Sequence, residues 1–157
     1  LEDQDRTLWD RAAIAEARGL VERSFASGEV GAYAIQAAIA AEHAAAASIE
    51  ATEWARIVEL YDLLLRAEPS PIVALNRAAA LAMRESPDVG LAEVDRVMAG
   101  GALDGYYPAH AARAELCRRV GRFDEAAAGF SRALALARQE PVRRHLEKRL
   151  AEVERLR

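Results

Sequence analysis

The stretch AELCRRVGRFDEAAAGFSRA, residues 114–133, decides the fold of this chain. Ala114 and Ala126 are small residues at the positions where two neighbouring helices would cross, and small side chains allow a close approach. Gly121 stands between the two helical segments, where a tight turn needs a residue without a side chain. The stretch therefore predicts two antiparallel helices in close contact, with its two phenylalanines filling the space against neighbouring helices.

Related patterns recur along the chain at a spacing of 34 to 35 residues. The residues that align at this spacing are Ala45, Ala79 and Ala114, and likewise Tyr61, Asp95 and Phe130. This period is the length of one tetratricopeptide unit, a pair of antiparallel helices that must stack on a neighbour to bury its apolar face. We therefore predict an all-α fold, a tetratricopeptide-like right-handed α-solenoid of about seven to eight antiparallel helices.

Three segments make up the predicted domain, which spans residues 1–157 as a single unit. Residues 1–31 would form a polar motif and a first helix, residues 32–141 about three repeat units, and residues 142–157 a capping helix. The middle repeat is degenerate, because Asp88 and Asp95 stand where aromatic residues are expected. The last segment has apolar residues on one face and charged residues on the other, as a terminal cap requires.

Local signals place the helix ends. The expected helices cover about residues 7–26, 32–48, 52–67, 72–84, 87–99, 107–120 and 123–138, and a last helix begins at Pro141. We expect Thr7 and Thr52 to begin their helices as capping residues. The buried side of the first helix is expected to consist of Leu8, Trp9, Ala12, Ala13, Leu20 and Phe25.

Composition excludes several classes of function. The formal net charge is −4, so the chain has no overall basic field, and unaided DNA binding is not expected. The chain has no uninterrupted apolar stretch of membrane-spanning length and no secretory leader, so we expect no membrane contact and a cytoplasmic location. The single cysteine, Cys117, lies in a helical pattern and is expected to be a small buried apolar residue. Because Leu1 is not an initiator methionine, we expect a piece of a longer polypeptide.

We find no pattern typical of catalysis or metal binding. His43, His110 and His145 do not have the spacing of a metal site, and no phosphate-binding glycine loop or nucleophile elbow is present. We expect a protein that is not an enzyme and that has no cofactor.

A groove along the inner surface of the predicted array is the first candidate site. Its candidate partner-binding residues are Glu42, Asn76, Arg77, Met83, Glu115 and Arg118. Asn76 is the strongest, because an amide can donate to one backbone carbonyl and accept from one backbone N–H of a bound peptide. Two alternatives stay open: Asn76 instead satisfies a hydrogen bond within the fold, and Arg77 instead pairs with an internal carboxylate.

The polar opening is the second candidate site. Its residues are Asp3, Asp5, Arg6, Trp9 and Asp10. They are interpreted either as a polar network held by one apolar anchor, Trp9, or as a solvated helix start with Trp9 in the core.

Nearly the whole chain resembles a known family. The residues that carry the resemblance are Leu1-Glu2-Asp3-Gln4-Asp5-Arg6 with Trp9-Asp10; Tyr33 with Gln36-Ala37-Ala38-Ile39-Ala40-Ala41 and His43; Trp54-Ala55 with Leu60-Tyr61-Asp62; Pro69-Ser70-Pro71 with Ala74-Leu75-Asn76-Arg77-Ala78; Gly90-Leu91-Ala92; Gly105-Tyr106 with His110-Ala111-Ala112-Arg113-Ala114; and Gly121-Arg122 with Glu125-Ala126-Ala127. With them the chain resembles the C-terminal extension of one group of extracytoplasmic-function (ECF) sigma factors of bacterial RNA polymerase.

The resemblance implies a helical, tetratricopeptide-like domain that follows the promoter-recognising sigma regions two and four, which lie outside this sequence. It also implies a regulatory role, with the sigma regions, RNA polymerase or a regulator protein as partners. The alternative is a free-standing scaffold that binds a peptide in its groove. In that case, Asn76→Ala would weaken peptide binding by about 1 kcal/mol or more, through one lost hydrogen bond, without unfolding the domain. Exposed terminal repeats also allow a homodimer.

Overall fold

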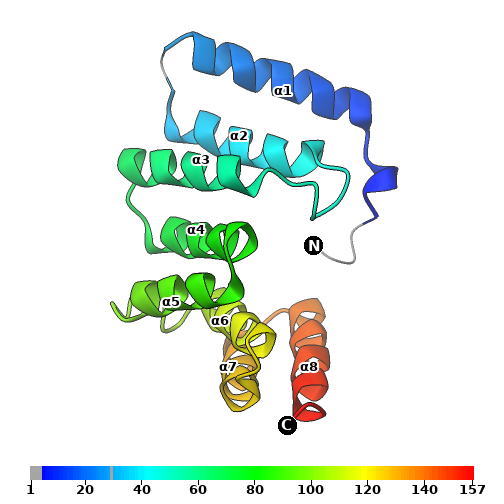
Figure 1. Ribbon diagram of the computed structural model, residues 1–157, viewed down its shortest axis with the longest axis vertical. Helices are drawn as coiled ribbons and strands as arrows, with labels where there is room; N and C mark the ends of the chain where they lie inside the picture. The colour runs from blue at the N-terminus through cyan, green and yellow to red at the C-terminus, as the bar shows by residue number, and fades with distance from the viewer. Residues whose placement is uncertain (1–4, 29) are drawn as a thin grey trace. The chain divides into compact units, whose positions relative to one another are not determined.

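The computed structural model describes residues 5–28 and 30–157, and over these ranges it is all helical, with eight α-helices, one short 3-10 helix and no strand (Figure 1). The elements are η1 (Arg6–Leu8), α1 (Arg11–Ala26), α2 (Ala32–Ala45), α3 (Trp54–Ala67), α4 (Pro71–Arg84), α5 (Pro87–Met98), α6 (Tyr107–Arg119), α7 (Phe123–Leu136) and α8 (Glu140–Glu154). The predicted fold class is confirmed. Within the same ranges, no helix has both the length and the apolar character needed to cross a membrane.

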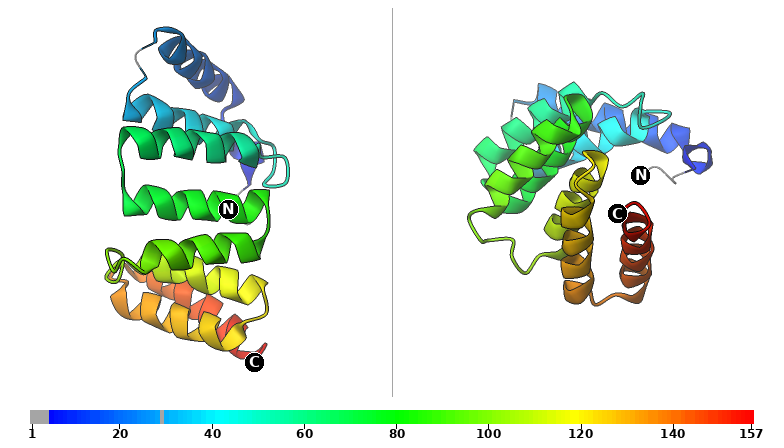
Figure 2. Two further views of the ribbon diagram at one scale, coloured as in Figure 1. Left: turned by 60° about the vertical axis from the view of Figure 1, so that its left-hand side comes forward. Right: turned by 60° about the horizontal axis from the view of Figure 1, so that its bottom comes forward.

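The chain divides into two compact units, Leu1–Val73 and Ala74–Arg157, and the boundary falls inside α4. In the first unit α2 packs against both α1 and α3, and in the second unit α6 packs against α5 and α7, with α8 against α7 (Figure 2). Each of these helices lies beside the one before it in the chain, as in the hairpin packing of an α-solenoid. The division into three repeat units within one domain stays a prediction.

The second unit is built around close helix crossings. Ala114 and Ala126 are fully buried, and Gly121 makes the turn between α6 and α7 with a φ of 78°, in the left-handed region that favours glycine. Two further glycines allow crossings that no side chain could enter. A Cβ atom on Gly90 of α5 would lie 2.2 Å from the Cβ of Ala82 in α4, and one on Gly129 of α7 would lie 2.9 Å from the Cβ of Ala114.

Two predicted helix starts are wrong. The first helix begins at Arg11, because the Asp10 side chain accepts hydrogen bonds from the backbone N–H groups of its first turn, whereas Thr7 lies in the preceding 3-10 helix. The third helix begins at Trp54 after Glu53, whose side chain makes no capping bond. Thr52 instead donates its hydroxyl to the carbonyl oxygen of Ser48, at 3.0 Å.

The predicted buried side of the first helix is also wrong in part. Leu8 is 81% exposed and Leu20 is 56% exposed, and no residue of α1 is fully buried. Ala12 and Ala13 are exposed as well, whereas Phe25 is half-buried as predicted. The other half-buried apolar residues of α1 are Ile14 and Val21. Because α1 packs against α2, only one narrow stripe of its surface is covered.

Candidate functional site

The opening motif is held by a buried arginine. The Arg6 side chain is only 5% exposed, and its Nη1 atom donates to the carbonyl oxygens of His43, Ala46 and Ser48 at 3.2, 2.9 and 3.3 Å. These carbonyls lie in the last turn of α2 and just beyond it, where the helix itself provides no donors. A positive charge at this end of a helix also complements the helix dipole. Arg6 therefore caps α2 from outside the helix.

One tryptophan ring packs on this arginine, and a second tryptophan packs on His43, whose carbonyl oxygen the arginine binds. The guanidinium carbon of Arg6 lies 5.1 Å from the centroid of the Trp9 ring, and the Trp54 ring meets the His43 ring edge-on with centroids 5.4 Å apart. Trp54 also donates from Nε1 to the carbonyl oxygen of Ile49, at 3.1 Å. We call Arg6, Trp9, His43 and Trp54 the Arg6 anchor. It joins the start of the chain to α2, α3 and the loop between them.

The other residues of the opening motif have local roles. Asp5 accepts from the backbone N–H of Thr7 at 3.0 Å, and Asp10 accepts from the N–H groups of Ala12 and Ala13, also at 3.0 Å. Each carboxylate thus caps the helix that follows it. Asp3 lies outside the described residues.

The second unit has a similar helix cap. Arg143 of α8 donates from Nη1 to the carbonyl oxygens of Leu134 and Ala137, at 2.9 and 3.2 Å. Both carbonyls lie at the end of α7. In each unit, the last carbonyls of a helix are therefore bound by an arginine from another element.

His43 makes the Arg6 anchor sensitive to acid. Burial lowers the pKa of His43 below its ordinary 6.5, and the charge of Arg6 lowers it further. The Nδ1 atom of His43 is buried without a hydrogen-bond partner among the described residues. Below about pH 6.5 the unfolded chain therefore binds a proton more readily than the folded chain, and the free energy of unfolding falls as the pH falls.

We expect this loss of stability to be visible in urea titrations at about pH 7.5 and about pH 5.5. A His43→Phe variant, which keeps a ring against Trp54, should lose most of the difference between the two pH values. The control is His145→Gln at an exposed position of α8, which should keep the difference. An equal pH dependence in the wild type and in His43→Phe would contradict the assignment.

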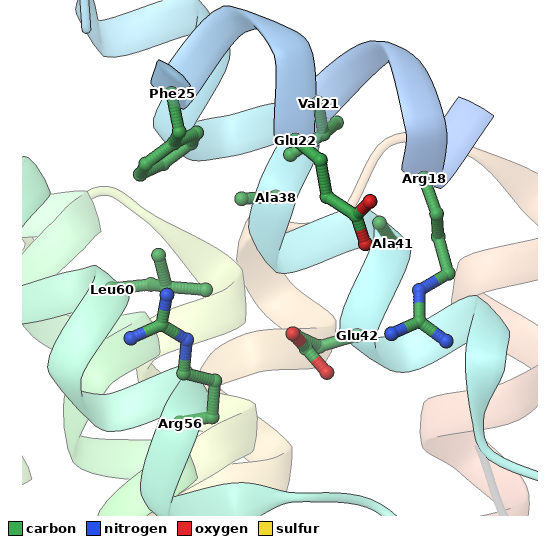
Figure 3. Close-up of a pocket in the computed structure, with 9 residues that line it drawn as sticks. All are labelled: Arg18, Val21, Glu22, Phe25, Ala38, Ala41, Glu42, Arg56 and Leu60. Carbon is green, nitrogen blue, oxygen red and sulfur yellow. The ribbon is translucent and has the colours of Figure 1, made fainter. Parts of the chain in front are cut away.

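A cavity of about 300 Å³ lies between α1, α2 and α3 of the first unit (Figure 3). Its apolar lining residues are Val21, Phe25, Ala38, Ala41 and Leu60, and its charged lining residues are Arg18, Glu22, Glu42 and Arg56. The Glu22 carboxylate comes from α1 and the Glu42 carboxylate from α2, and both point into the space between the helices, with one arginine on either flank (Figure 3). Glu42 was predicted as a site residue. Arg18, Glu22 and Arg56 were not predicted as site residues, although the four-residue spacing of Arg18 and Glu22 places them on one helix face.

The other predicted groove residues lie in the second unit. Asn76 is exposed on α4, and Arg77 lies 3.8 Å from Glu93 of α5. Met83, also on α4, accepts a contact from Arg119 Nη1 at 3.5 Å. A single groove that also includes Glu42 of the first unit stays a prediction.

Glu115 and Arg118 belong to an ion-pair network on α6 and α8. Arg118 binds Glu115 at 2.6 Å, Arg149 of α8 binds the same carboxylate, and Arg149 also binds Glu152 at 2.7 Å. This network links the last helix to α6. It gives the two predicted site residues a structural role within the unit.

A second network explains the aspartate at a degenerate repeat position. Asp95 of α5 binds Arg113 of α6 at 2.6 Å, and Arg113 also binds Glu125 of α7 at 3.0 Å. Hydrogen bonds from Arg113 and Arg122 hold the pKa of Glu125 below its ordinary value. Where the repeat pattern predicts an aromatic contact, three helices are joined by charged residues instead.

Comparison with known proteins gives one informative match. No protein-family model matches this chain. An uncharacterized protein of Rhizobium meliloti (strain 1021) is 47% identical to it over 137 residues, which cover 87% of this chain and 32% of that relative. The chain thus spans about a third of the length of the curated relative that it matches.

Proposed function

We propose that this chain is a regulatory protein-interaction domain, the C-terminal extension of an ECF sigma factor. It would modulate transcription initiation through contacts with sigma regions two and four, RNA polymerase or a regulator protein, and it would not act as an enzyme. The proposal draws on the family resemblance of the opening motif and of most of the repeats. The relative in Rhizobium meliloti is about three times as long as the matched segment, which leaves room for other domains in that protein.

The observation that carries the proposal is the Arg6 anchor. A regulatory extension can act on a preceding domain through a connection that fixes their relative orientation, and a flexible linker would not fix it. Here Arg6 is buried and bonded to three carbonyls at the end of α2. A polypeptide that precedes Asp5 would therefore start from a point fixed on the first unit.

The test is transcription with the full-length parent polypeptide and core RNA polymerase. Inserting four Gly/Ser residues between Gln4 and Asp5 leaves the Arg6 anchor intact but makes the connection flexible. We expect output from the cognate promoter to change several-fold, while the free energy of unfolding of this chain stays the same. The control is the same insertion after Arg157. Unchanged output with the first insertion, or a parent protein that does not bind core polymerase, would contradict the proposal.

This insertion is a cleaner test than a charge swap of Asp5 and Arg6. The sequence alone predicts that such a swap changes promoter output and leaves the melting temperature of the isolated domain unchanged. Because Arg6 is buried and bonded to three carbonyls, we expect the swap also to lower the melting temperature, so its effect on promoter output would be harder to interpret. The alternative, a free-standing scaffold, predicts that no sigma regions precede Leu1 in the parent reading frame.

A further inference from the structure

The cavity between α1, α2 and α3 has the chemistry to receive one long basic side chain. Val21, Phe25 and Leu60 provide an apolar surface, and the carboxylates of Glu22 and Glu42 enter the same space from two helices (Figure 3). Lysine and arginine side chains place their methylene stems on apolar surface and keep the charged end at a polar group. The volume of about 300 Å³ is at the lower end of the range for ligand sites, and a single side chain is a suitable occupant.

The charge of the first unit favours a basic partner. Leu1–Val73 contains 13 acidic and 6 basic residues, a net charge of −7, whereas Ala74–Arg157 contains 12 acidic and 15 basic residues, a net charge of +3. A field of one sign around a cavity raises the local concentration and the association rate of ligands of the opposite sign. The first unit therefore attracts cations, although the chain as a whole is only weakly acidic.

The two arginines at the cavity favour a peptide over a small cation. Arg56 also binds Glu59 at 3.2 Å, so part of its charge is already compensated. Guanidinium groups cannot accept hydrogen bonds, but they can donate to the backbone carbonyl oxygens of a bound segment. Because Arg18 and Arg56 lie on the flanks of the two carboxylates, they are placed for such contacts on either side of an inserted side chain (Figure 3).

We propose that this cavity binds a lysine or arginine side chain of a basic peptide segment in a partner protein. The stem of that side chain lies on Val21, Phe25 and Leu60, and its charged end lies between Glu22 and Glu42. Charge-assisted hydrogen bonds to the two carboxylates provide the specificity. The site is distinct from the Arg6 anchor, so the inference holds for a sigma-factor extension and for a free-standing scaffold alike.

The experiment uses the ¹⁵N-labelled 157-residue chain and three peptides. The probe is acetyl-Gly-Ala-Leu-Arg-Ala-Leu-Gly-amide, and the matched peptides carry citrulline or glutamate in place of its arginine. Citrulline keeps the shape of arginine without the charge. We expect amide shifts concentrated around the cavity in α1, α2 and α3, and affinity for the citrulline peptide lower by about tenfold, which corresponds to about 1.4 kcal/mol.

The matched protein variants distinguish binding in the cavity from attraction by the overall negative charge of the first unit. Glu22→Gln with Glu42→Gln should weaken binding of the arginine peptide by about tenfold. Glu16→Gln with Glu68→Gln removes the same charge at exposed positions outside the cavity lining and should weaken binding less than about threefold. Equal losses in the two double variants, equal binding of the citrulline peptide, or preferred binding of the glutamate peptide would overturn the proposal. The sigma-factor proposal would be unaffected, because it rests on the Arg6 anchor.

Discussion

Replacing Arg6 by methionine will lower the free energy of unfolding of the first unit by about 2–3 kcal/mol. Methionine keeps an apolar stem but leaves the carbonyls of His43, Ala46 and Ser48 without their donor. Bonds from a charged donor to buried acceptors are among the stronger side-chain contributions to stability. The variant also loses the charge at the end of α2 and the contact with the Trp9 ring.

Urea-induced unfolding followed by tryptophan fluorescence measures this loss directly. The chain has two tryptophans, Trp9 and Trp54, and both belong to the first unit and to the Arg6 anchor. The control is Arg23→Met, the same substitution at an exposed position of α1, which should cost less than about 0.5 kcal/mol. A loss below about 1 kcal/mol for Arg6→Met would show that Arg6 does not hold the opening motif in place.

Replacing Gly90 by alanine will destabilise the second unit by about 3 kcal/mol. The new Cβ atom would lie 2.2 Å from the Cβ and 2.8 Å from the Cα of Ala82, so the backbones of α4 and α5 must move apart. Alanine is better than glycine in a helix by about 1 kcal/mol, and the expected figure is the loss that remains after this gain.

Two other glycines in the same chain provide comparison variants for this test. Gly129→Ala should destabilise the chain less than Gly90→Ala, because its new Cβ would lie 2.9 Å from a side-chain atom of Ala114. Gly19→Ala on α1 should be neutral or stabilising, because its Cβ would meet only the flexible end of Arg23 at 3.3 Å. Thermal unfolding followed by circular dichroism ranks the three variants. Any order in which Gly90→Ala is not the least stable would contradict the close crossing of α4 and α5.

Local signals were sufficient to predict the helices of the second unit. Gly121 forms the predicted turn, and Ala114 and Ala126 are buried at the predicted crossings. Such features are predictable because a small residue, a turn glycine or a proline acts within a few positions of itself. The predicted and observed ends of α4 coincide at Arg84, and those of α3 at Ala67.

The start of the chain was harder to predict because distant residues decide it. Arg6 binds carbonyls 37 to 42 residues away, and no local pattern shows that a charged side chain will be buried there. The choice between Thr7 and Asp10 as the capping residue is also ambiguous in the sequence, since both residue types cap helices well. The Arg6 anchor resolves it, because η1 occupies the segment in which Thr7 would have begun a helix.

The residues that line the candidate cavity were also hard to predict, because distant parts of the sequence bring them together. Glu42 was predicted from its position in a repeat, whereas Glu22 and Arg56 join it only through the packing of α1 and α3 on α2. A periodic pattern gives the face on which a residue lies. It does not show which residues of the neighbouring helices line the other side of the cavity.

The two arginine caps have a consequence for how the protein responds to its surroundings. A guanidinium group keeps its charge at every pH at which proteins fold, so the bonds from Arg6 to α2 and from Arg143 to α7 do not weaken through loss of a proton. His43, beside Arg6, can take up a proton, and burial together with the charge of Arg6 lowers its pKa below the ordinary value, so the fold opposes this protonation. Mild acidification would therefore weaken the Arg6 anchor at the end of α2. The hydrogen bonds from Arg143 to the end of α7 would keep their strength.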